Sequence, residues 1–256
     1  MENKLNYPIL DVKEQILEEN DRIAAGTRKA LADQGVFLIN LMGSPGAGKT
    51  SVLLQLIKRL GDRYRIGVLE ADVDSDVDAR TVAEAGARVV QLHTGGLCHM
   101  DAAMTKQGLD ALCLEDLDVV FLENVGNLVC PAEFDVGADL RMMILSVPEG
   151  DDKPLKYPLM FTVSDVMLIN KIDTAPIFDF DPEAAAARAR ALNPDIEIFP
   201  ISAKTGEGFD DLAAWLGRRL DRTVGGGALD APSQRIVPDI RAVQGPAPTT
   251  EGGREL

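Results

Sequence analysis

Aromatic residues, cysteines, histidines and basic residues are all scarce in this sequence. Aromatic residues make up 5% of its 256 residues, so a hydrophobic core must consist mainly of aliphatic side chains, as in buried parallel sheets. Three cysteines are too few, and odd in number, for a disulfide framework, which indicates a reducing compartment. Basic residues number 26 against 41 acidic ones. A surface this acidic repels phosphate backbones and anionic lipids, so we expect neither nucleic acid nor a membrane as a partner.

Long hydrophobic runs are missing near the start of the chain. The uncharged stretch 34–48 is too short to span a bilayer and is interrupted by Pro45. The first ten residues, MENKLNYPIL, lack the apolar run of a signal peptide. These absences predict a soluble protein of the cytoplasm.

Short apolar runs alternate with helical patterns along most of the chain. This alternation is typical of an α/β fold with a mostly parallel sheet and helices on both faces. The expected strands are 36–41, 66–70, 88–92, 119–123, 141–147, 166–170 and 197–200. The expected helices are 11–34, 49–60, 77–84, 101–113, 182–192 and 209–219. We expect residues 1–34 to form a helical extension, 35–222 the main domain, and 223–256, where glycine and proline recur, a disordered tail.

A phosphate-binding loop is predicted directly after the first of these strands. The stretch GSPGAGKT fits the pattern G-x-x-x-x-G-K-[ST] and lies between an expected strand and an expected helix, as the motif requires. Its backbone N–H groups and the helix N-terminus suit phosphate oxygens. We expect Lys49 to reach the β- and γ-phosphates and the Thr50 hydroxyl to bind Mg²⁺. The predicted phosphate-binding residues are Gly43, Ser44, Pro45, Gly46, Ala47, Gly48, Lys49, Thr50 and Ser51.

Two later patterns predict a guanine-binding site. The NKxD pattern ends an expected strand, and its Asp173 carboxylate can accept hydrogen bonds from N1–H and the exocyclic amine of guanine, a donor pair that adenine lacks. An SAK segment after the next strand resembles the loop of GTPases whose backbone amide contacts guanine O6. The predicted base-binding residues are Asn170, Lys171, Asp173, Ser202, Ala203 and Lys204. Together with the phosphate loop, they favour GTP over ATP as the substrate.

The segment ENVG after the expected strand 119–123 looks like a GTPase switch II with Glu in place of the usual Asp. The Glu123 carboxylate can hold a water of Mg²⁺, and the Gly126 N–H can approach the γ-phosphate. Five acids lie within residues 70–78, and Asp72 is our candidate for a second group near Mg²⁺. No residue is an evident general base. Hydrolysis is therefore expected to depend on positioning and electrostatics by Lys49, Thr50, Asp72, Glu123 and Gly126.

Cys98, His99 and Cys130 are candidate ligands for a soft metal ion. Thiolate and imidazole suit Ni²⁺, Zn²⁺ and Cu⁺. Cys130 lies seven residues after Glu123, so a movement of the phosphate-sensing segment would move a metal ligand. A Cys-His pair can equally be structural. Cys113, at an apolar position of an expected helix, is expected to be a core residue.

Five segments together resemble the HypB-type GTPases that assist nickel insertion into hydrogenase. They are GSPGAGKT, TGGLCHMDA, FLENVGNLVCPAEFD, EGDDKPLKYP and NKID, spread over residues 35–220. The ENVGNLVCP and GGLCH segments are the specific ones, because a generic phosphate-loop protein has no reason to contain them. Urease-type and cobalamin-linked GTPases share the phosphate loop and the NKxD pattern but not this pair of segments.

The resemblance implies a P-loop NTPase fold of the SIMIBI class, with Mg²⁺ as a cofactor. It implies that Cys98, His99 and Cys130 bind Ni²⁺ or Zn²⁺ at the interface of a homodimer promoted by GTP or metal. A HypA-type nickel metallochaperone is the implied partner, docking on the N-terminal helical region, and the large subunit of a [NiFe]-hydrogenase is the implied target. Lys153, in the segment DKPLKYP, is a candidate contact to the nucleotide or to the second protomer.

The chain departs from some members of this family near its N-terminus. Those members carry a cysteine cluster or a histidine-rich stretch there, whereas this chain has only His93 and His99, and no cysteine before Cys98. We therefore expect neither a high-affinity N-terminal nickel site nor a storage role. Transfer of nickel to this chain from a partner protein therefore becomes more important.

Two alternatives remain open. The chain could serve another metalloenzyme, such as urease. It could also be a metal-binding or storage module that does not hydrolyse nucleotide. The intact Lys49, Thr50, Asn170 and Asp173 argue against a vestigial nucleotide site, and the scarcity of histidine argues against storage.

Overall fold

The computed structural model describes residues 12–72 and 77–224. Its strands form one sheet in the order β3-β2-β4-β1-β5-β6-β7, and all neighbouring strands run parallel. The strands are β1 (Phe37–Gly43), β2 (Ile66–Asp72), β3 (Arg88–His93), β4 (Val119–Glu123), β5 (Leu140–Ser146), β6 (Val166–Asn170) and β7 (Glu197–Pro200). The predicted α/β fold with a mostly parallel sheet is confirmed. Expectations for residues 1–11, the acidic segment 73–76 and residues 225–256 of the expected tail lie outside the described residues. The last helix continues to Val224, beyond the predicted end at 219, so residues 223–224 belong to it and not to the tail.

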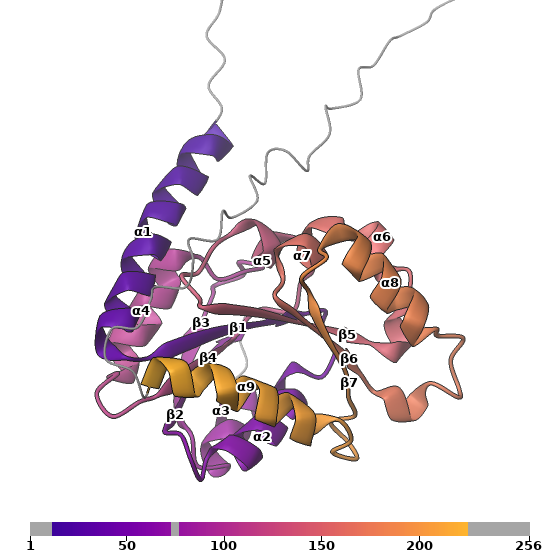
Figure 1. Cartoon of the computed structure of the whole chain (residues 1–256). Helices are drawn as coiled ribbons and strands as arrows, with labels where there is room; N and C mark the ends of the chain where they lie inside the picture. Colours follow the sequence, from indigo (N-terminus) through magenta and orange to yellow (C-terminus); the bar gives the residue numbers. More distant parts are fainter. Residues whose placement is uncertain (1–11, 73–76, 225–256) are drawn as a thin grey trace, which may run out of the picture.

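Helices cover both faces of the sheet (Figure 1). One face carries α2 (Lys49–Leu60), α3 (Val77–Glu84) and α9 (Phe209–Val224). The other carries α1 (Val12–Gln34), α4 (Ala102–Leu112), α5 (Cys130–Glu133), α7 (Pro158–Val163) and α8 (Pro182–Leu192), with α6 (Lys153–Lys156) packed on α7 and α8. Two short 3₁₀ helices, η1 (Val147–Glu149) and η2 (Ile172–Thr174), follow β5 and β6. None of the described helices is long and apolar enough to cross a membrane.

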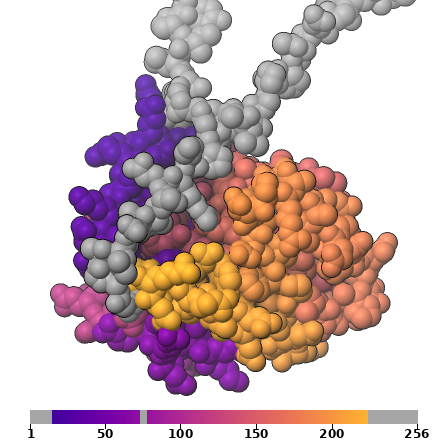
Figure 2. Space-filling view, in the orientation of Figure 1, coloured from indigo at the N-terminus to yellow at the C-terminus, as the bar shows by residue number. Residues whose placement is uncertain are grey.

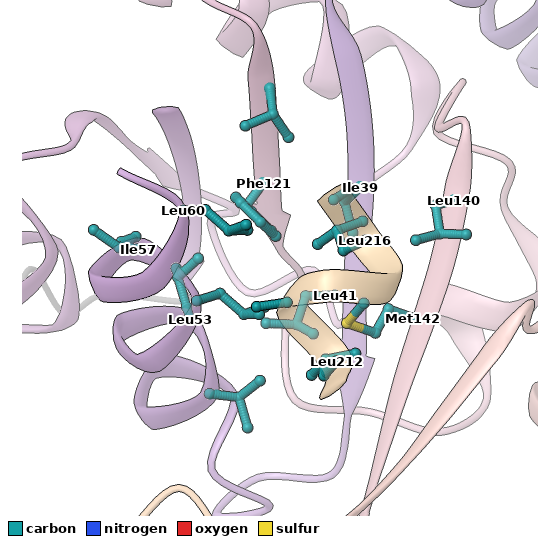
Figure 3. Packing of buried hydrophobic residues seen from close by; sticks show 14 of the residues in the cluster. Ile39, Leu41, Leu53, Ile57, Leu60, Phe121, Leu140, Met142, Leu212 and Leu216 are labelled. Carbon is teal, nitrogen blue, oxygen red and sulfur yellow. The ribbon is translucent and has the colours of Figure 1, made fainter. Parts of the chain in front are cut away.

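The core consists mainly of aliphatic side chains, as the shortage of aromatic residues predicted. Leu53 and Leu60 of α2 lie beside Phe121 of β4, and Leu216 of α9 lies over Ile39 of β1 (Figure 3). Each fully buried side chain of this size contributes about 1.5–3 kcal/mol. In the space-filling view α9, in yellow, covers the middle of the visible face (Figure 2).

The short helices α5, α6 and α7 were not predicted. They are four to six residues long, too short for an apolar stripe to repeat. Each has a proline in its first two positions, namely Pro131, Pro154 and Pro158. Proline is favoured there because its fixed φ suits a helix and its missing N–H has no partner to lose. A proline followed by helix-compatible residues was therefore the available signal.

The long helix α1 lies beside α4, outside the sheet (Figure 1). Its buried residues Asn20, Ala24, Thr27 and Leu31 recur at helical spacing, which places them on one stripe. The phosphate loop, the Cys98 segment and the Cys130 segment follow β1, β3 and β4 respectively. Because these strands are parallel, the three segments meet at the carboxyl edge of the sheet, where ligands bind in open α/β folds.

Candidate nucleotide and metal sites

The phosphate loop joins β1 to α2 and depends on glycine. Its backbone is left-handed at Gly46 (φ +73°) and Gly48 (φ +97°), a region that glycine adopts without strain. A Cβ atom at residue 48 would lie 2.6 Å from Nδ2 of Asn170, so a larger residue would displace the base-binding segment. In the described structure no side chain caps the N-terminus of α2. Its N–H groups are therefore available to a phosphate anion.

Lys49 and Thr50 extend from the first turn of α2. The Lys49 ammonium donates a hydrogen bond to the Ser44 carbonyl oxygen at 3.5 Å, across the loop. The Thr50 hydroxyl donates to Oε1 of Glu123 at 2.9 Å. Thr50 and Glu123, two of the three residues predicted to act near Mg²⁺, are thus brought into contact. Ser51 is exposed on the same turn.

Three carboxylates gather beside this contact. Ligand oxygens of Glu70, Asp78 and Glu123 lie within 4.8 Å of one another. Burial, followed by repulsion from Glu123, raises the pKa of Glu70 to about 10. Burial also raises the pKa of Glu123 to about 7, although the Lys49 ammonium opposes the shift. Two buried carboxyl groups this close resist ionising together unless a cation joins them.

The carboxylate group fits a magnesium ion. Oε2 of Glu70 and Oε2 of Glu123 are buried and receive no hydrogen bond from the described residues. Such oxygens, with the Thr50 hydroxyl beside them, are ligands of the kind that Mg²⁺ prefers. Asp72 is not in this group: it ends β2 and pairs with His93 of β3. Its predicted role near Mg²⁺ stays a prediction.

The base-binding segments are tied to each other and to the phosphate loop. Asn170, 1% exposed, donates to the Ala47 carbonyl oxygen at 2.9 Å and accepts from the Ala203 N–H at 3.1 Å. The Ser202 hydroxyl donates to Oδ1 of Asp173 at 2.7 Å. The Lys171 ammonium donates to the Gly46 carbonyl oxygen at 2.6 Å. The structure thus assembles the predicted NKxD and SAK residues next to the phosphate loop, with Lys204 in the same turn.

The segment after β4 lies directly against the phosphate loop. A Cβ atom at Gly126 would lie 2.9 Å from backbone atoms of Pro45, so only glycine permits this approach. The next residue, Asn127, donates its backbone N–H to the Gly43 carbonyl oxygen at 3.0 Å. Its side chain donates to the Cys98 carbonyl oxygen at 3.2 Å. Asn127 therefore contacts the phosphate loop and the candidate metal site at once.

The three candidate metal ligands lie together. Sγ of Cys98 is 3.1 Å from Sγ of Cys130 and 3.8 Å from Nδ1 of His99. Two sulfurs bound about 2.3 Å from one metal would be roughly 3.3 Å apart at a right angle and 3.8 Å at the tetrahedral angle. The observed 3.1 Å is close to the right-angle value, so the two sulfurs could share an ion after moving slightly apart. Cys98 is exposed and the other two are half-buried, so the site is open to solvent.

Neighbouring groups influence the position and the protonation of these three candidate ligands. The imidazole ring of His99 stacks on Phe134, with ring centroids 4.1 Å apart. Burial lowers the pKa of His99, which favours the neutral, metal-binding form. The hydrogen bond with Cys98 raises the pKa of the Cys130 thiol. The buried side chain of Asn124 accepts from the Met100 N–H at 3.1 Å, which fixes the segment after His99.

Cys113 and Lys153 lie outside these clusters. Cys113 is exposed at the end of α4 with φ +55°, so the expectation that it is a core residue was wrong. The helical pattern was extended one residue too far, past Leu112. Lys153 begins α6, and its ammonium lies 5.2 Å from the centre of the Tyr157 ring. Its contact with nucleotide or a second protomer stays a prediction.

Sequence reasoning missed several supporting residues. Glu70 pairs with Glu123 in the register of β2 and β4, and each glutamate ends a predicted strand, 66–70 and 119–123. Asn124 and Asn127 lie within ENVGN, where only the glutamate and the glycine had been assigned roles. No sequence signal connected Phe134 with the metal site.

Comparison with known proteins agrees with this geometry. A family model described as "CobW/HypB/UreG, nucleotide-binding domain" matches residues 37–200. The hydrogenase maturation factor HypB of Azotobacter vinelandii is 47% identical over 213 residues, covering 82% of this chain and 70% of that protein. The hydrogenase/urease maturation factor HypB of Helicobacter pylori is 37% identical over 224 residues, covering 84% of this chain and 91% of that protein.

A solved structure gives the same result for the fold. The crystal structure of HypB from Helicobacter pylori in complex with nickel superimposes with a TM-score of 0.76 at 34% identity, covering 83% of this chain and all of that one. The resemblance inferred from GSPGAGKT, GGLCH and ENVGNLVCP is thereby confirmed. The chain belongs to the CobW/HypB/UreG nucleotide-binding family and, within it, to the HypB-type hydrogenase maturation factors.

Proposed function

We propose that this protein hydrolyses GTP and uses the nucleotide state to control nickel bound by Cys98, His99 and Cys130, for insertion into a [NiFe]-hydrogenase. The observation that carries the proposal is the position of Asn127. Its backbone bonds the phosphate loop, its side chain bonds the Cys98 carbonyl, and Cys130 follows three residues later. A change at the γ-phosphate position can therefore reach two metal ligands through one residue.

Specificity for guanine rests on Asp173, held by Ser202, and hydrolysis on Lys49, Thr50 and Glu123. Mg²⁺ held by these groups would supply positive charge to the β- and γ-phosphates. Slow turnover is expected, because the chain shows no evident arginine finger in the sequence. Asp72 and Gly126 keep their proposed roles beside the cation and the γ-phosphate.

The metal site favours a homodimer promoted by GTP or metal. One chain offers three soft ligands, whereas structural sites for such ions are commonly four-coordinate. Leu97 is 46% exposed and Val129 is 48% exposed, and each directly precedes a cysteine ligand. Pairing of two chains across this apolar rim would bury both residues and bring two ligand sets together. We further propose a HypA-type chaperone and the hydrogenase large subunit as partners, and Ni²⁺ or Zn²⁺ as the ion.

Insertion of nickel into urease is the second candidate function. It is favoured by one observation, the name of the Helicobacter pylori relative, a hydrogenase/urease maturation factor. Purified apo-hydrogenase large subunit and apo-urease, each offered the nickel-loaded protein and GTP, separate the two candidates by which one gains nickel.

The central test is a nickel titration with light scattering, run with GDP and with a non-hydrolysable GTP analogue, beside phosphate release from GTP and ATP. Cys130→Ala should weaken nickel binding about tenfold or more in the GTP-analogue state, because loss of a ligand removes a metal–sulfur bond. Cys113→Ala is the matched control, an exposed cysteine at the opposite end of α4 from the Cys98 segment, and should leave the titration unchanged. Equal curves for Cys130→Ala and wild type would remove Cys130 from the site. Nickel binding without GTP turnover would favour a non-hydrolysing module.

A further inference from the structure

We propose that Asn20 of helix α1 is a positioning residue for the metal site. It ties the segment that carries Cys98 and His99 to the segment that carries Cys130. This inference rests on the proposed metal-binding function and adds a structural support outside the nucleotide-binding domain. Nothing in the sequence of α1 indicates such a role, since Asn20 lies far from every predicted ligand in the chain.

The Asn20 side chain is buried, 6% exposed, and makes two long-range hydrogen bonds. Its Oδ1 accepts from the Ala102 backbone N–H at 2.9 Å. Its Nδ2 donates to the Asp135 carbonyl oxygen at 2.9 Å. A buried amide with both ends paired in this way is costly to disturb, because each partner would be left without a hydrogen bond.

Both partners of Asn20 are close to metal ligands along the chain. Ala102 lies three residues after His99 and is the first residue of α4, whose early N–H groups need an outside acceptor. Asp135 lies five residues after Cys130 and directly follows Phe134, the ring that stacks on His99. One amide therefore fixes the spacing of the two ligand-bearing segments.

Helix α1 is itself held firmly in place. The Arg28 guanidinium forms an ion pair with the Asp135 carboxylate at 2.8 Å and donates to the Ala138 carbonyl oxygen at 3.3 Å. A Cβ atom at Gly137 would lie 2.8 Å from the Ala24 carbonyl oxygen, so the helix and this segment are in close contact. Displacement of α1 would loosen both ligand segments together, by a route that does not pass through Asn127 or the nucleotide.

The test compares wild type, Asn20→Ala and the control Asn193→Ala in the full-length protein. Asn193 also bridges segments, donating to the Ser164 carbonyl oxygen at 2.7 Å, but it lies at the end of α8, and both residues are remote in sequence from the candidate metal ligands. Nickel affinity and the sulfur-to-nickel absorption band are measured with GDP bound, beside GTP turnover. Asn20→Ala should weaken nickel binding about tenfold and change the band, as loss of groups that orient ligands does. Asn193→Ala should change neither, and both variants should turn over GTP like wild type.

The outcomes separate this inference from the proposed function. Wild-type nickel affinity and an unchanged band in Asn20→Ala would overturn the positioning role, even if the variant unfolds at a lower temperature. Should Asn20→Ala not fold, Asn20→Asp keeps the acceptor for Ala102 and loses the donor to Asp135. That variant should show the same changes at smaller size, and wild-type behaviour in it would equally overturn the role. Failure of wild type itself to bind nickel more tightly than Cys130→Ala would instead contradict the proposed metal site.

Discussion

The nucleotide site and the metal site share one edge of the sheet but are held in different ways. Asn170 and Ser202 at the nucleotide site are almost fully buried and bond directly to neighbouring loops. At the metal site Cys98 is exposed, and its position depends on Asn127 and, through Ala102, on Asn20. A binding site built into the core keeps one geometry, whereas one held by a few outside contacts can change when those contacts change.

The largest effect is expected for Lys49→Ala, which should impair the nucleotide site and leave the metal site intact. Lys49→Ala should lower GTP turnover about 100- to 1,000-fold, the usual cost of removing one group aimed at developing charge. Nickel affinity without nucleotide should change by less than about twofold, because the two sites have no shared ligand. Phosphate release and a nickel titration on the same preparation check both statements. A large loss of nickel affinity without nucleotide would show that the sites are not separable in this way.

Asp173→Asn tests whether the Asp173 carboxylate recognises the guanine base. The ratio of affinities for GTP and xanthosine triphosphate should fall about 100-fold, because hydrogen bonds to a carboxylate of this kind contribute about 1.5–3 kcal/mol. Competition binding with the two nucleotides measures the ratio. Asp179→Asn, at an exposed carboxylate of the following loop, is the control and should leave it unchanged. An unaltered ratio in Asp173→Asn would remove this residue from base recognition.

The difference between the sites also explains what the sequence could predict. The predicted β4, β6 and β7 and the helices α2 and α8 have the bounds that the structure shows, because short apolar runs, the phosphate-loop motif before α2 and the proline at the start of α8 are local patterns. The phosphate loop and NKxD are contiguous motifs with fixed chemistry, so each residue could be assigned. The meeting of Cys98 with Cys130 could only be inferred from family resemblance.

Contacts made across the fold leave no local pattern. Glu70 was passed over in favour of Asp72, because the register that places Glu70 opposite Glu123 belongs to the sheet and not to either strand. Asn20 lies on the buried stripe of α1, where a polar residue looks like an interruption of the apolar pattern. Its two partners are identified only once α1 is packed on α4 and the segment after α5.

Asn127→Ala tests whether the sites communicate. Allosteric coupling between two sites commonly changes affinity about 5- to 150-fold, and we expect wild type to show about a tenfold difference in nickel affinity between GDP and a GTP analogue. The variant should reduce that difference to about twofold, since its side chain no longer holds the Cys98 carbonyl. Isothermal titration with nickel in both nucleotide states provides the ratio. A ratio equal to that of wild type would exclude the Asn127 side chain from the coupling.

The smallest expected effect concerns Phe134, which supports only one ligand. Phe134→Leu keeps an apolar side chain beside His99 but removes the aromatic stack, a contact that contributes about 0.5–1.5 kcal/mol. Nickel affinity should therefore fall only about threefold, and affinity for GDP should not change. Phe178→Leu, a partly exposed aromatic residue remote in sequence from the metal ligands, controls for the substitution itself. A loss as large as that in Cys130→Ala would mean that the stacked ring determines the ligand geometry, and the metal site would then be as rigidly built as the nucleotide site.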